Sequence, residues 1–387
     1  MRHFDFLSEA DRQRLFLRAP EHFTASEDPG LLAVALGATL YSPASRPNLA
    51  ADIAARAAAG VVSLVVCLED AVADAELAAA EQNALAQLRA HAKTGATGPL
   101  VFVRVRAAEQ IRMIVAGLGE DAARILTGFV VPKFTDESGT EYLDAVVEAS
   151  ARLERRLFVM PVLESQEIIF AESRLGSLLG VRQLLDKYRE YVLAVRIGAT
   201  DLSAAYGLRR SRDLTVYDVR MIADVISDVV NIFGRADGTG YPVTGPVWEY
   251  FSATERMFKP QLREAPFVEH AEPRLRAELI AGDLDGLIRE VALDRANGLI
   301  GKTVIHPSHV AAVHALSVVT HEEFADATEI LGTSGAGGVA SSPYRNKMNE
   351  SKPHSAWARS TALRARAFGV AQEGVSFVDL LGASLHQ

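Results

Sequence analysis

The sequence has little of what secreted, membrane-spanning or nucleic-acid-binding proteins need. Its 387 residues include one cysteine, so no disulfide can form within the chain, and a reducing compartment is expected. No apolar run reaches the roughly 20 residues that span a bilayer. The charged start, residues 1–16, lacks the apolar core of a signal peptide. The formal net charge of −9 disfavours a general role on nucleic acid or on a membrane surface. We therefore expect a soluble cytoplasmic protein.

Two further absences narrow the fold and the chemistry. No G-x-G-x-x-G motif follows the first predicted strand, which gives a dinucleotide-binding fold little support. The lone Cys67 lies inside the apolar run VVSLVVCLED, a position typical of a core residue rather than a nucleophile.

What the sequence does contain is a regular alternation of apolar strands and helical segments. The predicted strands cover residues 37–43, 61–70, 100–106, 128–134, 157–165, 191–201, 240–251 and 298–310. The predicted helices cover residues 48–60, 75–92, 109–118, 141–154, 166–190 and 216–234. Such alternation indicates parallel strands covered by helices. Eight units over about 280 residues match an α/β TIM barrel, with a doubly wound sheet as the alternative.

The two ends of the chain differ from this repeating part. Residues 1–36 are predicted to form a polar, partly helical N-terminal arm, and residues 37–332 the barrel. The Gly- and Ser-rich stretch 331–344 indicates a linker or mobile loop. Trp357 and Phe368 lie in the helical pattern behind it, which a disordered tail would rarely carry. Residues 333–387 are therefore predicted to form a helical C-terminal segment that docks on another surface.

Charged residues gather where the predicted strands end. In a TIM barrel this C-terminal edge holds the active site. The polar residues at or near these ends are Glu69, Asp70, Arg104, Arg106, Lys133, Glu164, Asp201 and His306.

Glu164 and Asp201 end neighbouring strands of the predicted barrel. Neighbouring strands lie roughly 4.8 Å apart, so one ion can contact both carboxylates. Mg²⁺ is usually held by one or two carboxylates, waters and a substrate oxygen. The alternative is that each acid pairs with an arginine or caps the following helix. Taken together in this fold, the two acids favour metal ligation.

The basic residues at this edge each have two interpretations. Alternation places Arg104 and Arg106 on one side of their strand, and a guanidinium facing the barrel interior needs an anion. That anion is either a structural acid such as Glu69 or a substrate carboxylate. Lys133 either neutralises a phosphate or pairs with a neighbouring acid. His306 either lines the pocket or only hydrogen-bonds near the barrel end.

Several stretches, taken in order, resemble one known family. They are LYSPASRPNL, CLEDAV, VFVRVR, GFVVPKF, MPVLES, RIGATDLS and GLIGKTVIHPSHVAAV, within residues 37–315. The chain resembles the citrate lyase β-subunit-like branch of the HpcH/HpaI aldolase family. The resemblance implies a TIM barrel that binds Mg²⁺, one ion per subunit, and cleaves or forms a carbon–carbon bond next to a carbonyl.

The resemblance also implies roles for individual residues. Glu164 and Asp201 would ligate Mg²⁺, and Arg104 would bind the carbonyl or carboxylate oxygens of the substrate. Glu69 and Asp70 would lie in the same pocket. Arg46, in SRPNL, would meet the phosphates of coenzyme A or another extended substrate.

The implied reaction passes through an enolate that Mg²⁺ and Arg104 stabilise. The general base is left open between Glu69, a metal-bound water and the C-terminal segment. Two other activities are weighed: a related Mg²⁺-enolate enzyme such as a thioesterase, and a metal- and ligand-binding subunit without turnover.

The C-terminal stretch GGVASSPYRNKMNESKPHSAWARSTALRARAFGV resembles a branch of carbon–carbon bond lyases encoded beside phosphoribosyl-transfer enzymes. A phosphoribosylated or nucleotide-like substrate is then an alternative to a coenzyme A thioester. Relatives often place such a segment over the barrel mouth of a neighbouring subunit. The resemblance therefore implies a homo-oligomer, a trimer or hexamer with exchanged segments. The residues that would then face substrate are Asn346, Lys347, Asn349, Glu350 and His354.

Overall fold

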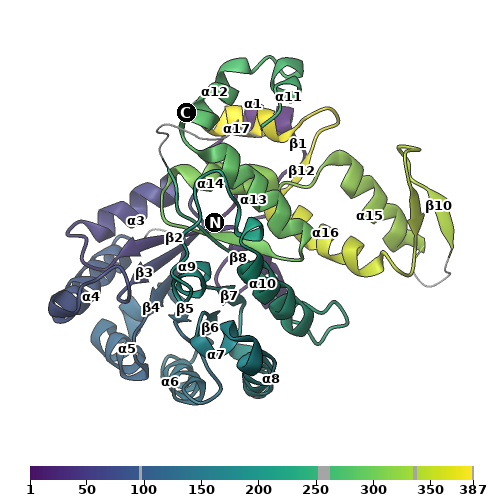
Figure 1. Ribbon diagram of the computed structural model, residues 1–387. Coiled ribbons are helices and arrows are strands. Elements are labelled where there is room, and N and C mark those ends of the chain that lie inside the picture. The colour runs from purple at the N-terminus through teal and green to yellow at the C-terminus, as the bar shows by residue number, and fades with distance from the viewer. Residues whose placement is uncertain (96–97, 252–261, 334–337, 386–387) are drawn as a thin grey trace.

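Eight parallel strands close into a barrel at the centre of the computed structural model (Figure 1). The structure describes residues 1–95, 98–251, 262–333 and 338–385. Each strand pairs with the next, and β9 pairs with β2 to close the ring, which confirms the TIM barrel and excludes the doubly wound sheet. The barrel strands are β2 (Ala38–Pro43), β3 (Ser63–Cys67), β4 (Leu100–Arg104), β5 (Leu126–Val131), β6 (Phe158–Leu163), β7 (Val195–Ile197), β8 (Val243–Trp248) and β9 (Ile300–Val304).

The strands form from apolar, β-branched runs because both of their faces are buried. All five residues of β3 are buried, for example. The helices that follow the strands are α3 (Leu49–Ala58), α4 (Leu77–Lys93), α5 (Ala108–Ala123), α6 (Gly139–Arg152), α7 (Gln166–Ile169), α8 (Ala171–Lys187), α9 (Ala199–Ala204), α10 (Arg220–Phe233), α11 (Ala265–Glu269), α12 (Pro273–Ala281), α13 (Leu284–Ala296) and α14 (Ser308–Ser317). Among them, α3, α6 and α10 have a clear apolar stripe and cover the outside of the ring, whereas α11 and α12 stand apart from it (Figure 1). In the described ranges, no helix combines the length and apolar character of a membrane span.

A buried ion cluster fixes β9 to the outer helices. Lys302 is fully buried, and its Nζ lies 2.9 Å from Oε1 of Glu290 and 2.7 Å from Oδ2 of Asp294, both on α13. Lys302 therefore faces outward, and by alternation the next residue, Thr303, faces the barrel interior. The Gly-Lys pair of the GKTVIHP motif is accordingly structural, while its threonine reaches the cavity.

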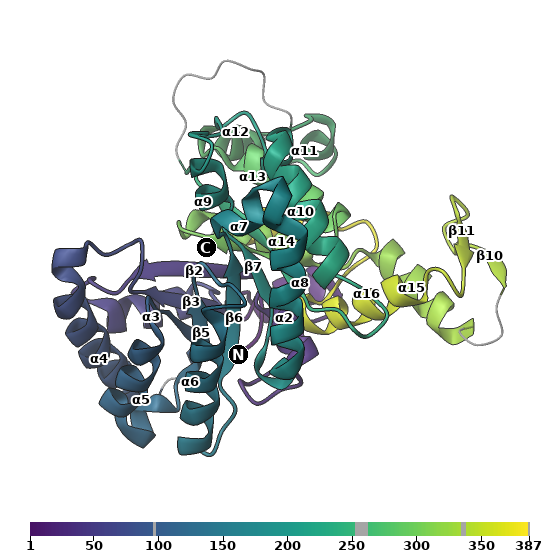
Figure 2. The ribbon, with the colours of Figure 1, turned by 60° about the horizontal axis from the view of Figure 1, so that its bottom comes forward.

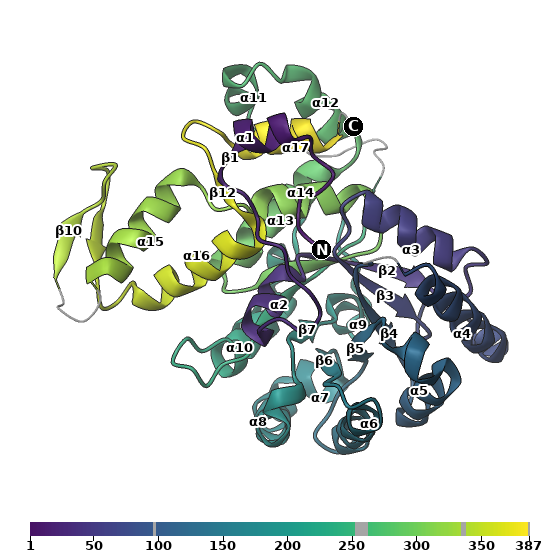
Figure 3. The ribbon, with the colours of Figure 1, turned by 180° about the vertical axis from the view of Figure 1, so that it is seen from behind.

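Both ends of the chain pack together as one layer, here called the terminal layer and defined as residues 1–36 and 321–385 (Figure 3). Helix α16 packs on α2, α17 packs on α14, and β1 pairs with β12. The layer meets the barrel where the strands begin, since the amide of Ala38 at the start of β2 lies within a cluster that includes His3 and Phe368. Its elements are α1 (Glu9–Leu15), β1 (Phe16–Arg18), α2 (Pro29–Ala35), α15 (His321–Thr333), β10 (Val339–Ser341), β11 (Met348–Glu350), α16 (Ser355–Phe368), β12 (Val370–Ala371) and α17 (Phe377–Leu385).

The predicted C-terminal segment is thus helical, and it docks on the N-terminal arm of its own chain. Helix α15 packs chiefly on α16, so it groups with this segment rather than with the barrel. The hairpin of β10 and β11 extends away from the barrel (Figure 2). Part of the predicted linker, residues 334–337, lies outside the described residues.

Candidate active site

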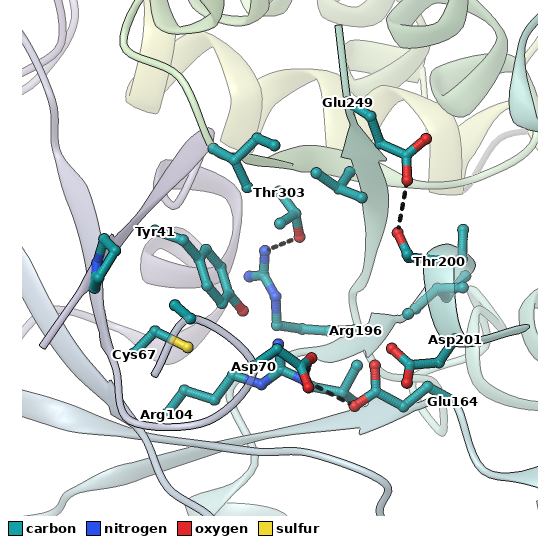
Figure 4. Close-up of a pocket in the computed structure, with 18 of the residues that line it drawn as sticks. Tyr41, Cys67, Asp70, Arg104, Glu164, Arg196, Thr200, Asp201, Glu249 and Thr303 are labelled. Atoms are coloured by element: carbon teal, nitrogen blue, oxygen red, sulfur yellow. Dashed lines mark hydrogen bonds and ion pairs between the residues drawn. The ribbon is translucent and has the colours of Figure 1, made fainter. Parts of the chain in front are cut away.

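A cavity of about 420 Å³ opens at the C-terminal ends of the strands (Figure 4). Its wall comes from seven of the eight strands or the turns that follow them, namely those of β2, β3, β4, β6, β7, β8 and β9. Among the predicted residues, it brings together Asp70, Arg104, Glu164 and Asp201. The side chain of Glu69 stands beside this group, on Arg104 and Lys133.

Glu164 and Asp201 face each other across the ends of β6 and β7 (Figure 4). Glu164 follows β6 directly and is buried, while Asp201 lies in the first turn of α9 and is one-third exposed. Neither carboxylate caps a helix, because the caps at α7 and α9 are Ser165 and Gly198. The capping alternative is therefore wrong for both acids.

Three groups hold the Glu164 carboxylate in place. Its Oε1 accepts hydrogen bonds from Nη2 of Arg104 at 2.9 Å and from the backbone N–H of Lys133 at 3.1 Å. On the other side, Gly198 leaves the space that the carboxylate needs. A Cβ at Gly198 would lie 1.9 Å from Oε2 of Glu164, so only glycine permits this approach.

The surroundings of Glu164 do not fully neutralise the charge of its carboxylate. Burial raises its pKa to about 7, the charge of Arg104 opposes this rise, and the nearby charge of Asp201 adds to it. A cation bound between the two carboxylates would favour the ionised form of Glu164 and so lower its pKa.

Arg104 and Lys133 join the acids into one network. Nη2 of Arg104 lies 2.7 Å from Oε2 of Glu69, 2.9 Å from Oε1 of Glu164 and 3.4 Å from Oδ2 of Asp70. Nζ of Lys133 lies 2.7 Å from Oε1 of Glu69 and 3.9 Å from Oδ1 of Asp201.

The charges of this network show whether a divalent cation fits the site. Its four carboxylates and two cations leave an excess of two negative charges when all are ionised. Within the described part of the chain, no three acidic, histidine or cysteine side chains are grouped to hold a metal alone. Mg²⁺ favours a site in which two carboxylates bind the ion and oxygens of water and substrate fill the other positions. The residues present therefore fit that ion.

Glu69 and Asp70 are adjacent in sequence but differ in their environments. Burial works against ionisation of Glu69, yet the hydrogen bond from Asp70 and the charge of Arg104 hold its pKa below the usual range. Burial and the negative charge of Glu69 raise the pKa of Asp70 to about 6. Glu69 is thus a fixed anion, and of these two acids Asp70 is the one that can exchange a proton near neutral pH.

Besides Glu69 and Lys133, three further predicted residues near the strand ends stand outside the cavity wall. Arg46 pairs with Asp52 at 2.5 Å on the rim. His306 stacks on Phe251, with ring centroids 4.6 Å apart. Arg106 does not share the orientation of Arg104, because β4 ends at Arg104 and alternation no longer applies. It turns to the carbonyl of Leu68, at 2.7 Å, and braces the loop that carries Glu69 and Asp70.

The predicted residues of the C-terminal segment lie in and beside the hairpin, away from the cavity of their own chain (Figure 2). Lys347 pairs with Asp326 of α15 at 2.7 Å, and Asn349 donates to the same carboxylate at 2.9 Å. Asn346 donates to Glu322 of α15 at 3.0 Å. His354 accepts from the backbone N–H of Glu350 at 3.0 Å. Within one chain, the segment therefore does not cover the site.

Sequence reasoning missed several residues of the cavity wall, among them Tyr41, Arg196, Glu249 and Thr303. A signal existed for Arg196, because it is a lone charge inside the apolar run YVLAVRIGAT. Glu249 follows β8 as Glu164 follows β6, and it accepts a hydrogen bond from Thr200 at 3.1 Å. Cys67, predicted to be a core residue, is buried but also touches the cavity.

The fold and the site define a TIM-barrel protein with an acidic centre at the C-terminal ends of its strands. The chain belongs to the family of C–C bond lyases of the TIM-barrel fold, whose model matches residues 30–370. No curated protein matches the sequence.

Several solved structures share this fold, and two of them serve as examples. The protein CitE from Mycobacterium tuberculosis, in complex with magnesium, acetoacetate and coenzyme A, is 22% identical, with a TM-score of 0.52 over 86% of this chain and 99% of that one. A citrate lyase from Burkholderia xenovorans LB400 is 16% identical, with a TM-score of 0.57 over 90% of this chain and 96% of that one. Both likenesses concern the fold.

Proposed function

We propose that the protein is a Mg²⁺-dependent carbon–carbon bond lyase that acts on a substrate with a carboxylate or 2-oxo acid group. The observation that carries the proposal is the facing pair of Glu164 and Asp201, beside Arg104, in a network whose acids outnumber its cations by two. Membership of the C–C bond lyase family supports the reaction class.

In this proposal Glu164 and Asp201 hold the ion. When bound, Mg²⁺ supplies a Lewis acid for the substrate's carbonyl oxygen, the atom on which enolate charge develops during aldol- or Claisen-type cleavage. Arg104 adds a fixed positive charge at the same end of the cavity, and Glu69 keeps that guanidinium in position through a 2.7 Å ion pair. The substrate then competes with Asp70 for the remaining donors of Arg104.

Asp70 is our candidate for the general base in the cleavage direction. It lines the cavity, its side chain is 56% exposed, and its raised pKa suits a group that takes a proton near neutral pH. Glu69 is a poorer base because two cations hold its carboxylate in the ionised form.

We further propose that the protein assembles as a trimer or hexamer, in which the hairpin reaches the cavity of a neighbouring subunit. Two observations support this. The hairpin extends away from its own barrel (Figure 2), and it exposes apolar side chains, with Val339 62% and Met348 56% accessible. In such an assembly Asn346 or Lys347 would face the neighbour's substrate.

The test is a carbon–carbon cleavage assay followed by NMR, with Mg²⁺ or with chelator. The panel contains free hydroxy and 2-oxo acids, their coenzyme A thioesters and phosphoribosylated acids. We expect Mg²⁺-dependent cleavage of at least one class, and a loss of roughly 100-fold or more in the Asp70→Asn variant.

Other results would overturn the proposal. Thioester hydrolysis without carbon–carbon cleavage would point to the related hydrolase. Mg²⁺-dependent binding without any turnover would point to a ligand-binding subunit. Turnover unaffected by chelator would contradict the metal assignment.

A further inference from the structure

Arg196 on β7 is a buried charge with no acid beside it. Its side chain points into the barrel, and the residue is 1% exposed. Nη2 donates to Oγ1 of Thr303 at 2.6 Å, and Nη1 lies 3.4 Å from Oγ1 of Thr39 and 3.7 Å from Sδ of Met160. All three partners are neutral. Among the described residues, no carboxylate lies within ion-pair distance of this guanidinium, and Nε has no hydrogen-bond partner.

The two arginines of the cavity therefore differ in kind. Arg104 contacts three carboxylates, whereas Arg196 contacts hydroxyls, a thioether and the ring of Tyr41, whose centroid lies 5.7 Å away. Burial raises the pKa of Tyr41, so its hydroxyl is neutral at pH 7 and supplies no counter-charge. Figure 4 shows Arg196 between Tyr41 and Thr303, directed away from the carboxylates of Glu164 and Asp201.

A buried guanidinium of this kind destabilises the fold unless an anion neutralises its charge. Burial lowers the pKa of Arg196, but arginine stays protonated in proteins. A buried charge without a partner destabilises the fold, so an unneutralised one in a cavity indicates a site kept for a ligand. Arg196 lines the cavity, so an anion can reach it.

The depth of Arg196 sets where that anion would bind. In the pairing of β6 with β7, Arg196 is opposite Val162, two residues before Glu164. Two residues correspond to roughly 7 Å along a strand. The backbone of Arg196 is thus one layer deeper in the barrel than the Glu164–Asp201 pair. A ligand that contacts both would enter with one end towards the barrel floor.

We propose that Arg196 binds a second carboxylate of the substrate on the barrel floor, so that the protein selects dicarboxylic over monocarboxylic 2-oxo acids. The proposal rests on the proposed function for the substrate's other end. A carboxylate suits the planar guanidinium, which offers two parallel N–H donors. A phosphate has more oxygens to satisfy than the neutral hydroxyls around Arg196 can serve.

The first experiment compares two ligands of equal chain length by calorimetry in the presence of Mg²⁺. In 2-oxoglutarate the end distant from the oxo group is a carboxylate, and in 2-oxopentanoate it is a methyl group. We expect the wild type to bind 2-oxoglutarate at least about 10-fold more tightly, as a charge-assisted pair should provide. Arg196→Met should reduce the preference to less than about 3-fold while 2-oxopentanoate binds as before.

The matched control is Arg155→Met. Arg155 is partly buried and bonded to a neutral carbonyl, that of Ala123 at 3.1 Å, but it does not touch the cavity. This variant should keep the wild-type preference. If Arg196→Met keeps the preference too, the proposal is wrong.

A second experiment uses no metal and separates this proposal from the proposed function. Glutarate should raise the melting temperature of the wild type but not that of Arg196→Met, and the unliganded variant should melt no lower than the wild type. If neither 2-oxo acid binds with Mg²⁺ but glutarate still stabilises through Arg196, the metal assignment fails and the anion site stands. The proposal is wrong if phosphate raises the melting temperature of the wild type more than glutarate does. It is also wrong if Arg196→Met melts several degrees lower than the wild type and still responds to glutarate as the wild type does.

Discussion

At the scale of single residues, the candidate site depends on a glycine, Gly198, which has no side chain. Gly198 lies between β7 and Asp201, and its lack of a Cβ lets the Glu164 carboxylate approach the backbone there. Glu164 and Asp201 can therefore face each other because the small residue Gly198 leaves room between them, and not because the two carboxylates attract each other.

Replacing Gly198 by alanine should therefore displace Glu164. The new Cβ would overlap Oε2 and Cβ of Glu164, at 1.9 and 2.5 Å. We expect Mg²⁺ affinity, measured by calorimetry, to fall about 10- to 100-fold, as when the support of a metal ligand is lost. Gly176→Ala on α8 is the control, because a Cβ there meets nothing within 4 Å. Equal Mg²⁺ affinity in the two variants would contradict the account.

Asp70 predicts the pH dependence of cleavage. A base must be deprotonated to act, and burial together with Glu69 raises the pKa of Asp70 to about 6. The rate in the cleavage direction should therefore rise with pH, nearly 10-fold per unit, up to about pH 6 and level off above it. A pH–rate profile checks this. A profile that is flat between pH 5 and 7, or one unchanged in Asp70→Asn, would exclude Asp70 as the base.

Individual residues show what sequence reasoning can and cannot reach. Asp70, Arg104, Glu164 and Asp201 were predictable because strand ends in a barrel converge on one edge. The ion-pair partners of these residues were not predictable, since a contact such as that of Arg104 with Glu69 depends on how far each side chain reaches. Arg196 has a weaker signal, because a lone charge inside an apolar run is unusual but has no strand end that would assign it to the cavity.

At the scale of elements, the strand ends decide which side chains enter the cavity. β4 ends at Arg104, so Arg106 leaves the alternation and holds the loop after β3 instead. The strands and most helices were predictable because their apolar patterns are continuous. The packing of α15 on α16 rather than on the barrel was not, because the apolar stripe of a helix does not reveal which surface it packs on.

Two histidines join the terminal layer to the barrel. Nε2 of His3 lies 2.9 Å from the carbonyl of Ala35 on α2, and Nε2 of His314 on α14 accepts from the backbone N–H of Ala38 at 3.2 Å. The two rings lie 4.4 Å apart, and His3 also stacks on Phe368 of α16. Both side chains are buried and neutral.

Acid should therefore loosen the terminal layer. Burial lowers the pKa of His3 to about 4 and that of His314 well below its usual value. The unfolded chain binds more protons once the pH falls below about 6.5, so stability is complete above that value and declines towards pH 4. For His3 alone the loss reaches roughly 3 kcal/mol.

Hydrogen–deuterium exchange at pH 7.5 and pH 5 measures this effect. Protection of α2 and α16 should fall at pH 5 more than protection of the barrel strands. The exposed His22 is the control, and His22→Gln should leave the change intact. Equal loss of protection across the chain would count against a local effect of the histidines.

At the scale of the whole molecule, the barrel has one face for chemistry and the opposite face for the terminal layer. The sequence predicts an N-terminal arm and a C-terminal segment beside the barrel. Their mutual packing was not predictable, because β1 and β12 are short and pair over more than 350 positions of sequence.

This packing determines how the assembly can be tested. Removing all of residues 333–387 would expose buried residues of α16 and α17, so the informative deletion is confined to the hairpin, residues 338–351. We expect this variant to keep the barrel fold by circular dichroism, to form a smaller oligomer in analytical ultracentrifugation, and to lose most turnover. Unchanged kinetics and unchanged mass would exclude exchange of the hairpin between subunits.

The central claim is that Glu164 and Asp201 share one divalent ion, and a calorimetric titration with Mg²⁺ tests it most directly. Asp228→Asn, on the outer surface beside Arg174, is the matched control. The account predicts one Mg²⁺ per chain in the wild type and in the control, and no measurable binding in Asp201→Asn or Glu164→Gln. Wild-type protein that binds no Mg²⁺, or Asp201→Asn that binds it as tightly as the wild type, would contradict the account.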